Sequence, residues 1–451
     1  MVQAEGSAPV EEGKGDIRSV LKNRPFLLLW LAQAVSQTAQ NGVFYALMVF
    51  LEEATSSTLH MSLLILSTIL PSVVLGVIAG VVVDRTSKKG VLVSTNLLRG
   101  IVVLGYLFLR GNVILLYVVN LTFSIISQFF APAEIATIPL LVKRRQLIAA
   151  NGLFNLTFTG AQLAGFVIIT PPLVKLIGTQ AFFWLVCIGY WVCAALVSFL
   201  PSDQVRSKRL SLLRVATLFG VLGEELRDGW RLLRGDPSLS FSMVYLTLTG
   251  TLMLVMGMLA PGYANRVLHI RTDDAVYVLA PAGVGIILGV LLLPVLVERA
   301  SKERLIHLGL WATGLSLLGL AGAPRGWHLW GARVGVRVEV FTVDLFSLVG
   351  TVMVLALVLG LAFSLVNVSA QTVLQERAPV EMRGRVFATQ LVFGNVASVV
   401  PLLFIGVLAD LVGIPRVILV VAGTVLLVAT LSTWAMRPRV FGRTDPAQDA
   451  S

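Results

Sequence analysis

Hydrophobic residues in this chain gather in long runs that short polar segments separate. A helix crosses a bilayer with about 20 apolar residues, and twelve runs approach or exceed that length. The pattern predicts an all-α membrane protein, and the even number of crossings places both termini on the same side. The predicted transmembrane helices are 26–51, 60–83, 91–109, 112–133, 149–175, 181–200, 239–264, 275–297, 305–323, 345–369, 386–409 and 416–436.

The polar segment 201–238 is the longest between runs, and it divides them six and six. We therefore predict a chain of five regions: a tail over 1–25, a six-helix bundle over 26–200, a linker over 201–238, a second six-helix bundle over 239–436 and a tail over 437–451.

Apolar residues recur at helical spacing within the linker, which predicts an amphipathic helix in the headgroup layer or against the bundle. They are Val215, Phe219, Leu222, Leu226, Trp230 and Leu233. We interpret this helix as a tie between the two halves rather than as a regulatory element. The segment 325–344 alternates Val with Arg or Glu in places, and it predicts a small external hairpin.

Two polar turns between runs resemble each other across half the chain. The segment 80–89 reads GVVVDRTSKK and the segment 294–303 reads PVLVERASKE, which pairs Asp84 with Glu298 and Lys88 with Lys302. The second copy lacks the glycine that opens the first. Internal repeats in a membrane chain indicate two related halves and point to a transporter.

Composition excludes a soluble domain, because 56% of the 451 residues are hydrophobic, only 13% are charged and the mean hydropathy is +0.87. A net charge of +11 would suggest a nucleic-acid partner for a soluble protein. Here 26 of the 35 lysines and arginines fall in segments predicted to be cytoplasmic, and eight on the opposite side. This positive-inside pattern predicts the cell (inner) membrane, with both termini cytoplasmic and anionic lipid, not nucleic acid, as the electrostatic partner.

Residues that could bind a metal or carry out catalysis form no recognisable motif. Cys187 and Cys193 lie on different faces of one predicted helix, and the four histidines fall near the ends of runs without ligand spacing. No phosphate loop or nucleophile–base constellation is present. We expect no cofactor and no enzymatic activity.

Polar side chains within the runs persist mainly where they face protein or a water-filled path. In the first run five of them, from Gln33 to Asn41, share one helical face. Hydrogen bonding between helices would explain any single one, but as a set they predict a wet, uncharged cavity for a substrate. The predicted cavity residues are Gln33, Gln37, Gln40, Asn41, Asn120, Ser124, Gln128, Asn155, Gln162, Asn367, Gln390 and Asn395.

Aromatic side chains in the same runs would suit an amphipathic or hydrophobic ligand in that cavity. The candidates are Phe44, Tyr45, Phe154, Phe158, Tyr245 and Phe393. Any of them could instead face lipid.

Arg99 is the one basic residue placed deep inside a predicted span, about nine residues or 13 Å from its end at 1.5 Å per residue. It needs a partner there, and Glu134 is the candidate, as a structural ion pair rather than a substrate contact. The spacing of Gly76 and Gly80, and of Gly285 and Gly289, predicts close helix packing in two further spans.

The turn after the second run resembles the signature loop of the major facilitator superfamily, G-x-x-x-D-R-x-G-R-K. Gly80, Asp84, Arg85, Lys88 and Lys89 match it, and Ser87 replaces a glycine. Four further segments resemble the drug and siderophore exporters related to enterobactin and macrolide efflux proteins. They are NLLRG at 96–100, APAEIATIPLLVKRRQLIAANGL at 131–153, EELRDGWRLLRGDP at 224–237 and RGRVF at 383–387.

The resemblance implies a monomeric secondary transporter in which two pseudo-symmetric six-helix bundles rock around a central site. It implies export of a small amphipathic or hydrophobic compound, such as a drug, siderophore or metabolite. An importer or facilitator on the same scaffold remains open, and a transporter-like receptor is a more distant alternative.

The resemblance also assigns Asp84 and its basic neighbours to a cytoplasmic latch. A helix N-terminus carries about half a positive charge, and the eleventh predicted helix begins near residue 383. Asp84 facing that N-terminus would hold the cytoplasmic side shut. The alternative is that the cluster only sets the topology.

The resemblance also implies proton coupling, which requires an acid that exchanges a proton within the membrane. Related exporters often carry an acidic residue in the first span, where this chain has Gln40. Only Glu134 and Asp410 approach the membrane interior, near opposite sides of the membrane. If protons are coupled, Glu134 is the predicted carrier.

Overall fold

The computed structural model describes residues 17–108, 111–202, 227, 230–231, 235–271, 275–330, 339–340, 343–344, 347–379 and 382–440. The first part is helical, with α1 (Ile17–Leu21), α2 (Arg24–Thr55), α3 (Thr58–Arg85), α4 (Lys88–Gly105), α5 (Val113–Leu141), α6 (Leu147–Leu163) and α7 (Thr170–Ser198). Short 3-10 turns occupy Tyr106–Phe108 and Arg144–Gln146, and a π-helical stretch, Ala164–Ile169, joins α6 to α7.

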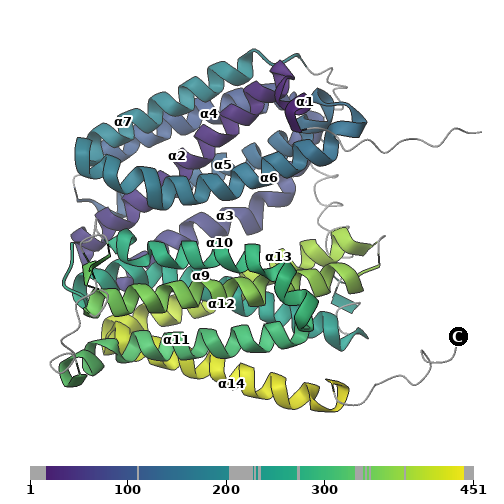
Figure 1. Cartoon of the computed structure of the whole chain (residues 1–451). Coiled ribbons are helices and arrows are strands. Elements are labelled where there is room, and N and C mark those ends of the chain that lie inside the picture. Colours follow the sequence, from purple (N-terminus) through teal and green to yellow (C-terminus); the bar gives the residue numbers. More distant parts are fainter. Residues whose placement is uncertain are drawn as a thin grey trace, which may run out of the picture. The chain divides into compact units, whose positions relative to one another are not determined.

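The second part contains six long helices, which Figure 1 places one beside another. They are α9 (Pro237–Arg266), α10 (Ala275–Arg299), α11 (Lys302–Trp330), α12 (Leu348–Arg377), α13 (Arg383–Val412) and α14 (Ile414–Val440). Between α11 and α12, two short strands, β1 (Glu339–Val340) and β2 (Val343–Asp344), pair antiparallel. This pairing bears out a hairpin at the end of the segment 325–344, whose residues 331–338 and 341–342 lie outside the described part of the chain. The segment's first residues are helical instead, because α11 extends as far as Trp330.

Ten segments of the described chain are long and apolar enough to cross a membrane. α2 is long enough but not among them, because its row of glutamine and asparagine side chains lowers its hydropathy. The segment Ala149–Ser198 has 50 residues, more than one crossing requires. Gly178 interrupts it with φ 80° and ψ 160°, a conformation that glycine adopts without strain, and this break lies between the fifth and sixth predicted spans.

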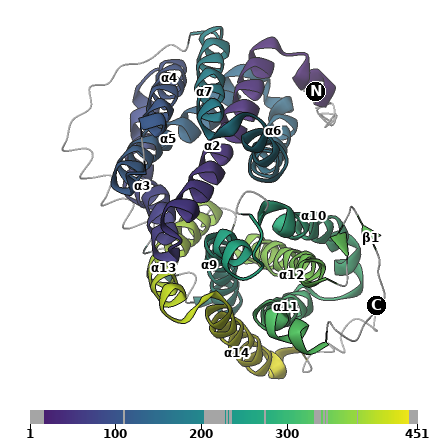
Figure 2. The same cartoon turned by 90° about the vertical axis from the view of Figure 1, so that its left-hand side faces the viewer.

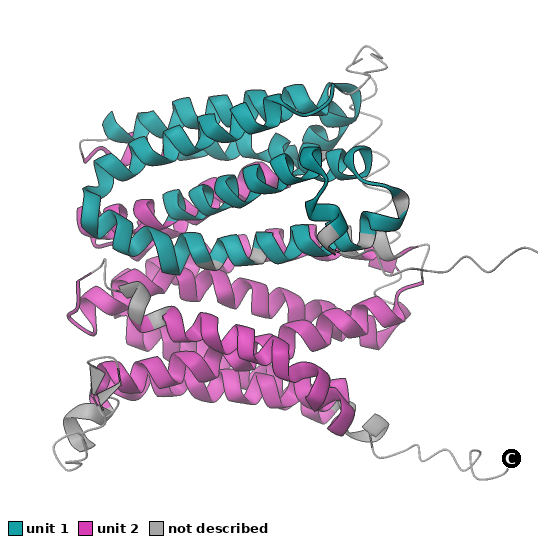
Figure 3. Ribbon diagram, turned by 45° about the horizontal axis from the view of Figure 1, so that its top comes forward, with its two compact units in different colours: residues 1–44, 74–110, 118–210 teal, residues 45–73, 111–117, 211–451 magenta. Residues whose placement is uncertain are grey.

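The chain divides into two compact units, coloured separately in Figure 3. Unit 1 comprises Met1–Phe44, Val74–Arg110 and Val118–Leu210, and unit 2 comprises Tyr45–Val73, Gly111–Tyr117 and Ser211–Ser451. The end of α2 and the beginning of α3 therefore belong to unit 2, although the rest of both helices belongs to unit 1.

The core of unit 1 is built from apolar side chains of α1 to α7, with α4 packed along α7. Its fully buried members include Phe26, Leu92, Phe130 and Cys193. Each helix buries one apolar face here. Side chains elsewhere, such as Trp184, remain exposed, as expected for helices whose outer faces contact lipid.

In unit 2, α12 lies between α9, α10 and α11, as Figure 2 shows. A Cβ atom on Gly360 would collide with the backbone oxygen of Ala282, and one on Gly285 with that of Leu357. The predicted close packing around Gly285 and Gly289 is thus confirmed.

The same prediction is wrong for α3 in this structure, where no atom of the described residues lies within 4 Å of a Cβ atom built on Gly76 or Gly80. Glycine spacing permits two helices to approach, but it does not supply the second helix. The predicted linker helix lies mostly outside the described residues. Of its apolar positions, Trp230 is described, and its ring packs 5.2 Å from that of Phe393.

Candidate functional site

Arg99, on α4, is only 1% exposed in the interior of unit 1. Its guanidinium donates hydrogen bonds to Ser36 Oγ (3.1 Å) and to the backbone oxygen of Ser127 (3.3 Å). The guanidinium carbon lies 4.3 Å from the centre of the Phe130 ring, a cation–π contact that gains strength where water is excluded. A helical hydroxyl, a carbonyl and an aromatic face therefore accommodate this buried charge.

Glu134, on α5, is also 1% exposed and lies close enough to Arg99 to attract it electrostatically. Its Oε1 atom has no hydrogen-bond partner within the described part of the chain, and neither has Nε of Arg99. The two groups predicted to pair thus share one buried region, while the hydrogen bonds of Arg99 go to Ser36 and Ser127.

Nine of the twelve predicted cavity residues lie in unit 1 and three in unit 2. Gln33 and Asn120 make hydrogen bonds between helices: Gln33 Nε2 donates to the backbone oxygen of Phe154 (3.2 Å), and Asn120 Oδ1 accepts from the hydroxyl of Tyr106 (3.3 Å). Those two, Gln37 and Ser124 are buried. Asn155 and Gln162 are exposed, and Gln40, Asn41, Gln128, Asn367, Gln390 and Asn395 are half-buried. The cavity remains a prediction.

The residues of the signature loop lie at the end of α3 and the start of α4. Ser87, which replaces the family's glycine, has an extended backbone and its Oγ accepts a hydrogen bond from Gly90 N–H (3.1 Å). The replacement therefore provides an N-cap for α4. Lys89 Nζ donates to the backbone oxygen of Leu200 (2.7 Å), and Asp84 is exposed.

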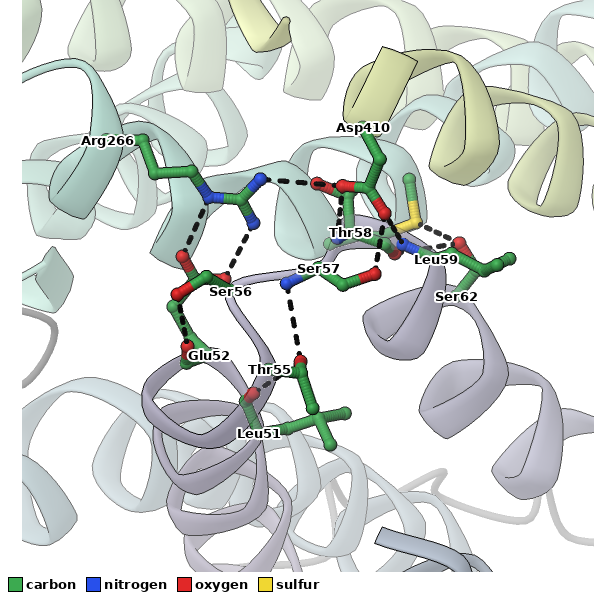
Figure 4. A network of polar contacts seen from close by, with 11 residues as sticks. Leu51, Glu52, Thr55, Ser56, Ser57, Thr58, Leu59, Ser62, Arg266 and Asp410 are labelled. Carbon is green, nitrogen blue, oxygen red and sulfur yellow. Dashed lines mark hydrogen bonds and ion pairs between the residues drawn. The ribbon is translucent and has the colours of Figure 1, made fainter.

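A polar network in the described part of unit 2 joins the ends of four helices (Figure 4). Arg266, at the end of α9, forms a paired contact with Glu52 near the end of α2: Nε to Oε1 is 3.0 Å and Nη2 to Oε2 is 2.9 Å. The Glu52 side chain is fully buried and that of Arg266 is 27% exposed. A planar guanidinium matches a carboxylate in this bidentate arrangement.

Asp410, near the end of α13, completes the network at the start of α3. Its Oδ1 accepts a hydrogen bond from Thr58 N–H (2.7 Å), and its Oδ2 accepts from Leu59 N–H (3.0 Å) and from Ser57 Oγ (2.6 Å). Arg266 Nη1 reaches Asp410 Oδ1 at 3.4 Å. The carboxylate therefore caps α3 and links it to α9.

Sequence reasoning missed Glu52 and Arg266 because both fall just beyond predicted spans. A usable signal was present: an acid follows the first run and an arginine follows the seventh, and the predicted topology puts both run ends on the outer side. Asp410 was noted only as an acid near a span end. Its role in capping α3 depends on a tertiary contact with residues more than 350 positions away.

Comparisons with known proteins agree with this architecture. The family profile described as Major Facilitator Superfamily matches residues 29–336. An uncharacterized MFS-type transporter, YfiS of Bacillus subtilis (strain 168), is 25% identical over 389 residues, which cover 84% of this chain and 84% of that protein. Macrolide efflux protein A of Streptococcus pyogenes is 25% identical over 372 residues, covering 75% of this chain and 88% of the relative.

Solved structures resemble the fold over nearly the whole chain. The nucleoside transporter NupG superimposes with a TM-score of 0.67 at 15% identity, covering 92% of this chain and 99% of that one. A POT family transporter in complex with 5-aminolevulinic acid gives a TM-score of 0.66 at 14% identity, covering 94% and 99%. At such identities the likeness concerns the fold alone.

Proposed function

The chain belongs to the Major Facilitator Superfamily, and from that membership we propose that it exports small amphipathic or hydrophobic compounds by alternating access. It is a multi-pass membrane transporter of this family rather than an enzyme. In our proposal it lies in the cytoplasmic membrane as a monomer with both termini inside.

The observation that carries the proposal of export is the similarity to macrolide efflux protein A, which extends over most of both chains. The polar residues of the spans support the substrate class. Apart from Arg99 and Glu134, they are mainly amides and hydroxyls, which suit an uncharged or weakly charged ligand better than a strongly charged one.

Drug susceptibility in a host that lacks its own pumps tests the direction of transport. Cells that express the chain should tolerate higher concentrations of macrolides or similar compounds, and Asp84→Ala should abolish that tolerance because it removes the proposed cytoplasmic latch. Glu298→Ala is the matched control: it changes the exposed acid of the second repeat, where Pro294 stands in place of the opening glycine, and should leave tolerance intact. Greater sensitivity of the expressing cells would favour an importer and contradict export.

We further propose that protons drive export through Glu134, whose buried Oε1 has no hydrogen-bond partner among the described residues. Inverted membrane vesicles with a pH gradient should accumulate substrate, and Glu134→Gln should reduce this pH-driven uptake to background because glutamine cannot carry the proton. Glu53→Gln, which alters the exposed acid next to Glu52 at the end of α2, should not reduce the uptake. If vesicles with Glu134→Gln take up substrate as well as the unsubstituted protein, Glu134 is not the proton carrier. The proposal of export would not be affected by that result.

A further inference from the structure

The first turn of α3 has its cap supplied by another helix. The first N–H groups of a helix lack partners within it and favour an acceptor, above all a negative one. Asp410 uses both of its carboxylate oxygens to accept from Thr58 N–H, Leu59 N–H and Ser57 Oγ. This is a charge-assisted contact between the end of α13 and the beginning of α3 (Figure 4).

Gly406 permits this contact, one helical turn before Asp410. A Cβ atom there would collide with Ser62 Oγ and lie 3.2 Å from the Cα atom of Leu59. Ser62 cannot move aside cheaply, because its hydroxyl donates to the backbone oxygen of Thr58 and lies 3.0 Å from the sulfur of Met258. Positions four apart lie on one helical face, so Gly406 and Asp410 together form one docking surface for α3.

A similar five-residue pattern, glycine followed four positions later by aspartate, occurs at the other end of α3. Residues 406–410 read GVLAD near the end of α13, and residues 80–84 read GVVVD near the end of α3. The two helices are of similar length, 30 and 28 residues. On the predicted topology they run in opposite directions, so each begins on the side of the membrane where the other ends.

We infer that Gly406 and Asp410 form an outer latch, the counterpart at the external face of the cytoplasmic latch proposed for Gly80 and Asp84. In this structure Asp410 is docked on α3, and Arg266 reinforces it by joining Asp410 to Glu52. Opening toward the outside requires the carboxylate to leave the first turn of α3. This inference rests on the alternating access of the proposed function.

Labelling of a buried position between the two helices tests the outer latch. Ser62 is 0% exposed, so Ser62→Cys, with Cys187 and Cys193 replaced by serine, should react with a membrane-impermeant maleimide only when the outer side opens. In whole cells without added substrate, Asp410→Asn should raise the labelling rate about tenfold, the order expected for loss of a charged helix cap. Glu53→Gln, which removes an exposed carboxylate from the same end of α2, should leave it unchanged.

The reciprocal substitution separates a latch from a merely structural contact. Asp84→Asn should lower labelling of Ser62→Cys, because weakening the cytoplasmic latch shifts the population toward the state that is closed outside. Opposite responses to Asp410→Asn and Asp84→Asn support the pair of latches. Equal labelling in both variants, or a rise in both, would overturn it.

A second variant guards against misfolding of Asp410→Asn. Gly406→Ala keeps the carboxylate but places a methyl group against Ser62, and it should also raise labelling in protein that remains monodisperse. Unchanged labelling in folded Gly406→Ala protein would likewise contradict the latch. Because the labelling experiment needs no substrate, its outcome does not depend on the direction of transport. If cells that express the chain gain no drug tolerance, the proposal of export is contradicted. If the substitutions do not change the labelling rate, the proposal of an outer latch is contradicted.

Discussion

Arg99 shows how a single buried charge is accommodated in this protein. Arg99 was expected to need a carboxylate, yet its hydrogen bonds go to Ser36 and to a helix carbonyl, and Phe130 covers the guanidinium. Arginine has five donors and a flat face that stacks on aromatic rings. Opposite charge along the sequence is therefore an incomplete guide to its partners.

The pair formed by Glu52 and Arg266 predicts an asymmetric response to substitution. Arg266→Gln leaves the fully buried Glu52 carboxylate without its counter-charge and should destabilise unit 2 by about 3–5 kcal/mol, the usual range for breaking a buried pair. Glu52→Gln should cost about 1–3 kcal/mol, because Arg266 is partly exposed and keeps Asp410 as a partner. Thermal unfolding in detergent measures both.

The double variant, Glu52→Gln with Arg266→Gln, serves as the control. It should be more stable than Arg266→Gln alone, since no unpaired charge is left buried. Equal losses in the two single variants would contradict the burial difference on which this prediction rests.

Helix packing shows what can be read from residue spacing and what cannot. The pairs Gly76–Gly80 and Gly285–Gly289 have identical spacing, but in the structure only the second faces a neighbouring backbone closely. Long apolar runs are predictable because a backbone in hydrocarbon must satisfy its hydrogen bonds as a helix. Which helix lies opposite a small residue depends on tertiary contacts and on the conformational state.

Gly360 on α12 offers a direct test at this scale. Gly360→Ala should destabilise the protein by about 1–3 kcal/mol, as overpacking does, because the added methyl group would strike the rigid backbone of Ala282. Gly423→Ala on α14 is the matched control: its site is exposed and no atom of the described residues lies within 4 Å of the added methyl group, so it should be neutral or slightly stabilising. The melting temperatures of the two variants in the same detergent test this prediction. An unchanged melting temperature for Gly360→Ala would contradict the close contact between Gly360 and the backbone of Ala282.

Across the whole molecule, the sequence predicted the helical fold and the family well. Eleven of the twelve predicted spans overlap the ten apolar segments of the described chain once Gly178 divides the longest, and the remaining one, 26–51, is the amide-rich α2. The candidate site was less accessible. Glu134 and the signature loop could be named in advance. The contacts of Glu52, Arg266 and Asp410 could not, because they join chain segments separated by hundreds of residues.

The assignment of residues 45–73 to unit 2 has a consequence for how the protein is made. Ribosomes deliver the N-terminal segments first, so the hairpin between α2 and α3 enters the membrane long before the helices that it packs against. After Glu52, 214 further residues must be synthesised before Arg266 is present to neutralise it. During that interval the newly inserted carboxylate must stay hydrated at the membrane surface, and truncated chains that end before α9 should present the hairpin to proteases.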